Sequence, residues 1–346
     1  LSGTDLDEVR IYNESLTSSE IQSISTASSS VSKESSLSMY REGSLELIDH
    51  GSSKEVANPI IINKTRYLVK TNWDPPGNIE VQKVDENWKN PSTVYTSSRS
   101  DVEETYVRYF PSYSKKKFFI IGNIVNNSGE FGFISTYDIE SESITDMAVA
   151  PNGEPYIIDM AKTQCGEDLY LTPGLSGPYM YRLNQSDVFQ PSNWNRIKLT
   201  DKLDDQDFNQ VESRITAFDC EIYGTSGQGG VRHYVMTKYN PGTGSKTDIL
   251  NKDYGDGPGN AVAYPRSTHK EYLTWAAPDN DGEYEVLISE DGNTFSNPVN
   301  FSRPGDNSGE THFFMYSRKN GRFFASAIQD GGPGWVKTVN NNGRLW

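Results

Sequence analysis

The residues of this sequence that could do chemistry recur at the beginning of a series of apolar segments. In four segments a glutamate is followed two positions later by a hydrogen-bonding or cationic residue. Two residues separated by one other point to the same side of a β-strand. These pairs are Glu104 and Tyr106, Glu154 and Tyr156, Glu212 and Arg214, and Glu310 and His312. In the two remaining segments, Asn58 and Asn260 occupy the corresponding places.

Carboxylates and tyrosine hydroxyls can accept and donate hydrogen bonds to sugar hydroxyls. The same carboxylates could hold a divalent cation such as Ca²⁺, although no cofactor is indicated firmly and no His/Cys cluster has zinc-like spacing. Arg108, Arg214 and His312 could pair with an acidic sugar. The alternative interpretation is that the glutamates only solvate the loop before each segment.

The elements that carry these residues repeat from residue 44 onward. Segments beginning at Asn58, Tyr106, Tyr156, Arg214, Ala261 and His312 are 48, 50, 58, 47 and 51 residues apart. Each is followed by a turn and further short strands with alternating apolar and polar positions. A period of about 50 residues is typical of a propeller blade of four strands. The sequence therefore predicts an all-β fold, a β-propeller over 44–346 with six blades, five or seven being the alternatives.

The sixth unit reaches Trp346 before a fourth strand can form. The stretch Ser44–His50 belongs to no other unit, so we predict that this N-terminal strand completes the last blade. Such a closure removes an exposed sheet edge.

In a propeller the innermost strands begin around one mouth of the central channel, where side chains from several blades converge. We therefore predict a ligand-binding site at that mouth. Its candidate residues are Asn58, Glu104, Tyr106, Arg108, Glu154, Tyr156, Glu212, Arg214, Asn260, Glu310 and His312.

The chain has 47 acidic and 32 basic residues, a net charge of −15. This charge argues against binding nucleic acid or an anionic membrane surface, which need basic patches. No apolar run approaches the roughly 18 residues that span a bilayer, so direct membrane insertion is not expected. The chain begins with Leu1, so we expect any export signal upstream. Five Asn-x-Ser/Thr sequons agree with an extracellular or cell-surface location.

The only two cysteines are Cys165 and Cys220. An exported protein could bridge them, and a cytosolic one would keep both reduced. Between these alternatives the sequence slightly favours free thiols.

The segment Leu6–Leu16 with Ser18–Ile21 resembles the closing strand of a laminin-G-like (concanavalin-type) domain in order and spacing. The resemblance implies that residues 1–22 are the terminal piece of such a domain. Residues 23–43 are Ser-rich with few large apolar side chains, which is typical of a linker.

Two further segments resemble propeller families. Ile288–Phe295 resembles the Asp-box of sialidase-type propellers, one residue shorter, which implies an aspartate and a serine bonding turn amides. Asn58–Ile62 with Tyr67 resembles the first blade of arabinanase-type glycosidases. The catalytic aspartate of that family is replaced by Asn58, and an amide cannot serve as a catalytic carboxylate. The resemblance therefore implies the fold without that mechanism.

We predict an extracellular module of a larger multidomain adhesion or surface protein, not an enzyme, that binds a glycan or a cell-surface glycoprotein. One alternative is a carbohydrate-active enzyme, either a glycoside hydrolase or a polysaccharide lyase, using the carboxylates at the channel mouth. Another is a structural or attachment module such as a viral fibre tip.

Overall fold

The computed structural model describes residues 45–49, 55–72, 76–85, 90–150, 157–174, 177–203, 211–228, 233–254, 264–268, 272–278, 283–295, 299–302, 309–317, 322–329 and 335–339. For some of them, including 45–49, 55–59 and all those after 295, it describes the backbone alone. The chain divides into units Leu1–Glu42 and Gly43–Trp346. The predicted laminin-G-like piece (1–22) and linker (23–43) lie outside the described residues.

The described strands form six four-stranded antiparallel sheets, here called blades 1 to 6. Blade 1 contains β2 (Glu55–Ile62), β3 (Thr65–Asn72), β4 (Glu80–Val84) and β5 (Ser92–Thr96). Blade 2 contains β6 (Val102–Arg108), β7 (Lys117–Asn126), β8 (Gly129–Asp138) and β9 (Ser143–Val149). Blade 3 contains β10 (Ile157–Lys162), β11 (Leu169–Pro173), β12 (Tyr179–Leu183) and β13 (Asn195–Lys198), with 3-10 turns η3 (Gln185–Asp187) and η4 (Pro191–Asn193) before β13.

Blade 4 contains β14 (Val211–Phe218), β15 (Glu221–Gln228), β16 (His233–Tyr239) and β17 (Lys246–Asp253). Blade 5 contains β18 (Tyr264–Thr268), β19 (Tyr272–Pro278), β20 (Glu283–Ser289) and β21 (Val299–Ser302). Blade 6 contains β22 (Gly309–Ser317), β23 (Arg322–Gln329), β24 (Trp335–Val339) and β1 (Leu45–Asp49).

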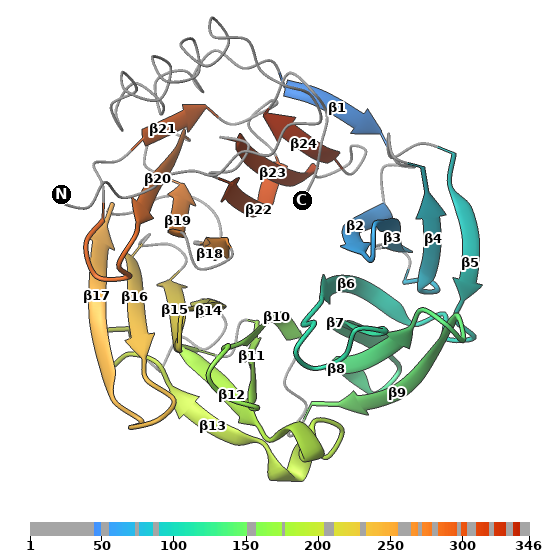
Figure 1. Ribbon diagram of the computed structural model, residues 1–346, viewed down its shortest axis with the longest axis horizontal. Helices are drawn as coiled ribbons and strands as arrows, with labels where there is room; N and C mark the ends of the chain where they lie inside the picture. The colour runs from blue at the N-terminus through green and yellow to red at the C-terminus, as the bar shows by residue number, and fades with distance from the viewer. Residues whose placement is uncertain are drawn as a thin grey trace, which may run out of the picture. The chain divides into compact units, whose positions relative to one another are not determined.

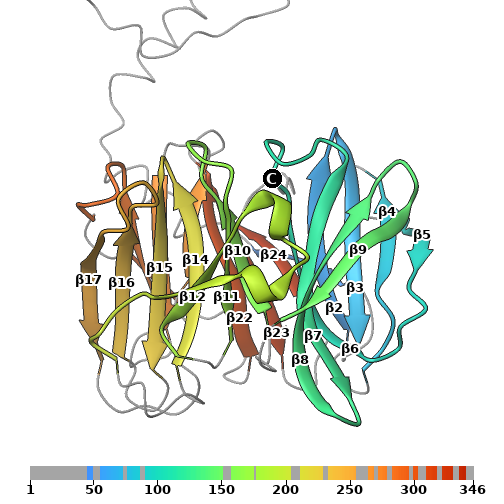
Figure 2. The same cartoon turned by 90° about the horizontal axis from the view of Figure 1, so that it is seen from below.

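The blades lie around a common axis, with β2, β6, β10, β14, β18 and β22 nearest to it (Figure 1). Each of these innermost strands contacts the next one in chain order. Seen from the side, the strands of blades 2 to 4 run roughly along the axis (Figure 2). This arrangement confirms the predicted all-β propeller.

The outermost strand of blade 6 comes from the other end of the chain. β1 pairs with β24 in an antiparallel register that runs from Leu45 opposite Val339 to Asp49 opposite Trp335. The predicted closure by the Ser44–His50 segment is therefore observed, and the edge of β24 is covered.

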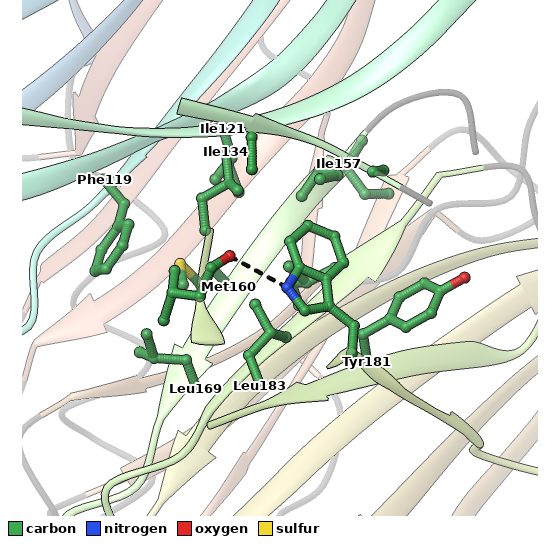
Figure 3. Packing of buried hydrophobic residues seen from close by; sticks show 14 of the residues in the cluster. Phe119, Ile121, Ile134, Ile157, Met160, Leu169, Tyr181 and Leu183 are labelled. Atoms are coloured by element: carbon green, nitrogen blue, oxygen red, sulfur yellow. Dashed lines mark hydrogen bonds between the residues drawn. The ribbon is translucent and has the colours of Figure 1, made fainter. Parts of the chain in front are cut away.

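The core lies between neighbouring blades, because each sheet buries both faces. In β7, Phe118 and Ile120 pack toward blade 1, whereas Phe119 and Ile121 pack toward blade 3 (Figure 3). A strand with both faces buried needs a continuous apolar run instead of an alternating pattern. This explains the continuous apolar run in β7, where the sequence analysis expected alternating apolar and polar positions.

Cys165 and Cys220 form a disulfide bond, with their Cα atoms 5.1 Å apart. Our preference for free thiols was wrong. Cys165 lies in the turn between β10 and β11, and Cys220 in the turn between β14 and β15. These turns belong to adjacent blades and meet at the surface, and the sequence alone did not show how close they come.

The turn after β20 is organised by Asp291. Its Oδ1 accepts hydrogen bonds from the backbone N–H groups of Asn293 (2.8 Å) and Thr294 (2.7 Å) and from the Ser289 hydroxyl (3.0 Å). Asp138, the last residue of β8, and Asn240, directly after β16, each accept two turn amides in the same way. A turn in which an Asp or Asn side chain accepts two backbone N–H groups therefore occurs in three blades. Such a turn does not identify one propeller family.

Within the described residues, no helix combines the length and apolar content required to cross a bilayer.

Candidate functional site

The structure describes the side chains of five of the eleven predicted site residues: Glu104, Tyr106 and Arg108 on β6, and Glu212 and Arg214 on β14. Asn58 lies in β2 and Glu310 and His312 in β22, where the backbone alone is described. Glu154, Tyr156 and Asn260 lie outside the described residues.

One of the five, Arg108, contacts Asp159 of β10, which sequence reasoning placed only in an apolar segment. Arg108 donates to Asp159 Oδ1 from Nε (2.9 Å) and from Nη2. The backbone N–H of Met160 also donates to Oδ1 (3.0 Å), and that of Ile215 donates to Oδ2 (3.3 Å). One fully buried carboxylate therefore joins the innermost strands of blades 2, 3 and 4.

Arg214 bridges the same three blades from the other side. Its Nε (2.8 Å) and Nη2 (2.6 Å) donate to Glu212 Oε1, and its Nη1 donates to the carbonyl oxygen of Ile158 (2.9 Å). Its guanidinium carbon lies 5.0 Å from the centre of the Tyr106 ring, within cation–π range. The side chain of Arg214 thus extends from blade 4 past the inner edge of blade 3 to blade 2.

Tyr106 is hydrogen-bonded to Glu104. Its hydroxyl donates to Glu104 Oε1 at 2.6 Å. Burial raises the pKa of Tyr106 well above its ordinary value of 10.0, and the negative charge of Glu104 raises it further. The hydroxyl therefore stays protonated and keeps donating. Within the described residues, Glu104 Oε2 accepts no hydrogen bond.

We call Glu104, Tyr106, Arg108, Asp159, Glu212 and Arg214 the axial network. Its members are not equally accessible: the side chain of Arg108 is 20% exposed and that of Glu212 12%, whereas that of Asp159 is 0% exposed. Glu104 is half-buried. The network therefore combines a buried structural lock with a partly exposed rim that offers both donors and acceptors.

β-bulges set the direction of several inner residues. The register of β6 on β7 shifts between Val102 and Glu104, and that of β10 on β11 shifts between Ile157 and Asp159. In β22 the shift lies between Thr311 and Phe313, so His312 is the extra residue. A bulge re-aims side chains and occurs often beside functional sites. Such bulges therefore lie near the start of three of the innermost strands.

Among the described residues, no group of three or more His, Cys, Asp or Glu side chains is placed to hold a metal ion.

No protein-family model and no curated protein matches the chain. Solved structures with a similar fold include the WD40 domain of a Toxoplasma gondii coronin, with 10% identity over 88% of this chain and 89% of that one and a TM-score of 0.45. A GH43_1 enzyme from Xanthomonas citri complexed with xylose is 11% identical over 76% and 96%, with a TM-score of 0.47. The periplasmic gluconolactonase PpgL of Pseudomonas aeruginosa is 11% identical over 82% and 72%, with a TM-score of 0.48.

Proposed function

We propose that this chain is a non-catalytic β-propeller that binds a glycan at the axial network and belongs to an extracellular or cell-surface protein. The observation that carries the proposal is the convergence of polar side chains from three blades in one network, of which Glu104, Arg108 and Glu212 are partly exposed. Glycan hydroxyls need donors and acceptors fixed close together, and a preorganised network offers them without a further ordering cost.

The geometry favours binding over hydrolysis. A glycosidase needs two carboxylates that both reach the scissile bond, one as acid and the other as base or nucleophile. Asp159 is fully buried behind Arg108, and Glu212 is held by Arg214. Of the described carboxylates in the axial network, this leaves Glu104 as the one with an open oxygen. Asn58 in place of a catalytic aspartate agrees with this interpretation.

The disulfide supports an exported location. Cys165 and Cys220 are both exposed, so a reducing cytosol would have access to their bond. Disulfides persist mainly in oxidising compartments. The resemblance of Leu6–Ile21 to a laminin-G-like strand adds a second module of the kind found in surface proteins.

A glycan array probed with the full chain tests the proposal. We expect binding to a defined set of glycans, and hydrogen exchange with a bound glycan should show added protection in β6 and β14. The outer strands β9 and β17 serve as internal controls. Absence of glycan binding, or protection confined to the outer strands, would reject the proposal.

The enzyme alternative gains one observation, because the Tyr106 hydroxyl and the Glu104 carboxylate form a close donor–acceptor pair. Incubating each bound glycan with the chain and analysing the products by mass spectrometry decides between the two. Shortened products that disappear in Glu104→Gln would favour the enzyme; intact glycans support the binding module.

A further inference from the structure

The structure describes the side chains of three of the five Asn-x-Ser/Thr sequons, those at Asn63, Asn126 and Asn184. Asn63 follows the last residue of β2, Asn126 is the last residue of β7, and Asn184 follows the last residue of β12. All three side chains are exposed. Asn13 lies outside the described residues, and Asn300 lies in β21, where the backbone alone is described. The three described sequons therefore begin where a strand ends and its side chains reach solvent.

The turn between β7 and β8 holds the side chain of Asn126 in one orientation. Asn126 Oδ1 accepts the backbone N–H of Ser128 at 2.8 Å, the hydrogen bond that asparagine commonly makes two residues along in a turn. Because the oxygen of the carboxamide is engaged, its Nδ2 is directed away from Ser128. Asn127, Ser128 and Gly129 are also exposed. The whole sequon thus stands clear of the packed sheet, with room for a bulky group on the nitrogen.

The amide nitrogens of Asn63 and Asn184 are accessible as well. Asn184 precedes the 3-10 turn η3, and its side chain makes no capping hydrogen bond to that turn. Asn63 Nδ2 donates to the Lys115 carbonyl oxygen at 3.4 Å, a long contact on an exposed surface. A carboxamide nitrogen carries two hydrogens, so Asn63 has a second one to exchange for a sugar while the first keeps this contact.

Turn formation explains these sequons only in part. Asparagine is common in turns, and the bond from Asn126 to position 128 accounts for the asparagine there. That bond uses only a backbone N–H, which every residue except proline supplies, so it does not require the hydroxyl of Ser128. At Asn184, the missing cap leaves the asparagine itself without a role in the turn. The combination of an exposed asparagine with a hydroxyl residue two positions later is what N-glycosylation requires.

We infer that Asn63, Asn126 and Asn184 are acceptor sites for N-linked glycosylation. The inference rests on the exported location proposed above, which the exposed disulfide between Cys165 and Cys220 supports. In the transfer, the asparagine Nδ2 loses a proton and forms a bond to C1 of a sugar. The bond from that C1 to the diphosphate of a lipid-linked sugar donor breaks. The diphosphate leaves with the electron pair of the broken bond, and the proton goes to a base of the transferase.

Secretion of the full chain from a eukaryotic cell line, with a secretion signal attached, tests the inference. Treatment with peptide-N-glycosidase in heavy-oxygen water converts each glycosylated asparagine to a labelled aspartate, which peptide mapping locates. We expect label at Asn63, Asn126 and Asn184, and a loss of mass of the intact chain on treatment. The attached signal imposes export, so secretion of a chain without label at these sites would overturn the inference. That result would leave the proposed location and glycan binding to their own tests.

Two variants separate the sequon from the asparagine. Ser128→Ala keeps Asn126 and the backbone N–H that bonds to it, but removes the hydroxyl. It should abolish the label at Asn126 alone, and the glycosidase-treated variant should keep the Tm of the treated parent chain. Asn193→Gln is the matched control, because Asn193 is an exposed asparagine outside any sequon, and its loss should leave all three labels in place. Label that persists at Asn126 in Ser128→Ala would contradict the inference, since the modification would then not depend on the sequon.

Discussion

Replacing Asp159 by alanine should show that the axial network holds three blades together. The change leaves Arg108 without its carboxylate and removes the acceptor of the Met160 and Ile215 amides. Breaking a buried ion pair on one side costs about 3–5 kcal/mol, and the partial exposure of Arg108 places the expected loss near the lower end.

For a folded unit of about 300 residues, the unfolding entropy is about 0.6 kcal/mol/K, so a loss of 3–4 kcal/mol lowers Tm by about 5–6 °C. Thermal denaturation followed by circular dichroism measures this shift. Asp101→Ala is the control, because Arg99 also donates to Asp101 from Nε and Nη2, to Oδ1 and Oδ2, at a more exposed site. An exposed pair contributes at most about 1 kcal/mol. Equal Tm shifts for the two variants would refute the reasoning that burial makes Asp159 important.

Three further predictions concern the turns. Removing the disulfide with Cys165→Ser/Cys220→Ser should cost about 4 kcal/mol for a loop of 55 residues, and added reductant should then no longer change Tm. Gly292→Ala should lower the free energy of unfolding, measured by urea titration, more than Gly244→Ala does. Both glycines have a positive φ, but a Cβ at Gly244 meets nothing within 4 Å, whereas one at Gly292 would lie 2.0 Å from Tyr223 Oη. Hydrogen bonds from the Thr294 and Asn293 amides lower the pKa of Asp291 below its ordinary 3.8. The contribution of the Asp291 carboxylate to the stability of the fold is therefore present above pH about 4 and is lost as the pH falls further. Asp291→Asn should flatten that part of a curve of Tm against pH.

The fold could be predicted because its signal is spread over the whole chain. A period of about 50 residues survives irregular loops, and the strand that closes blade 6 followed from counting strands per unit. The same-face pairing of Glu104 with Tyr106 and of Glu212 with Arg214 also followed, since it needs only the period of two within a regular strand. Both pairs are in contact in the structure.

The remaining features of the site could not be predicted, because bulges interrupt the two-residue alternation of the strands. Asp159 follows a bulge in β10, so the alternation in the sequence could not show that its carboxylate reaches Arg108 of another blade. A charged residue inside an apolar run was the available signal, and it should be given more weight in repeats of this kind. The disulfide required knowledge of which turns meet between blades.

The contacts of the axial network divide into those that join blades and one that does not. Arg108 and Asp159 satisfy each other in a buried lock, which holds the blades together whether or not a ligand is present. Glu104 differs, because it is half-buried and its Oε1 accepts from the Tyr106 hydroxyl of the same strand. If Glu104→Gln keeps the Tm of the parent chain yet weakens binding on the glycan array, whereas Asp159→Ala lowers Tm, the two roles of the network are separated.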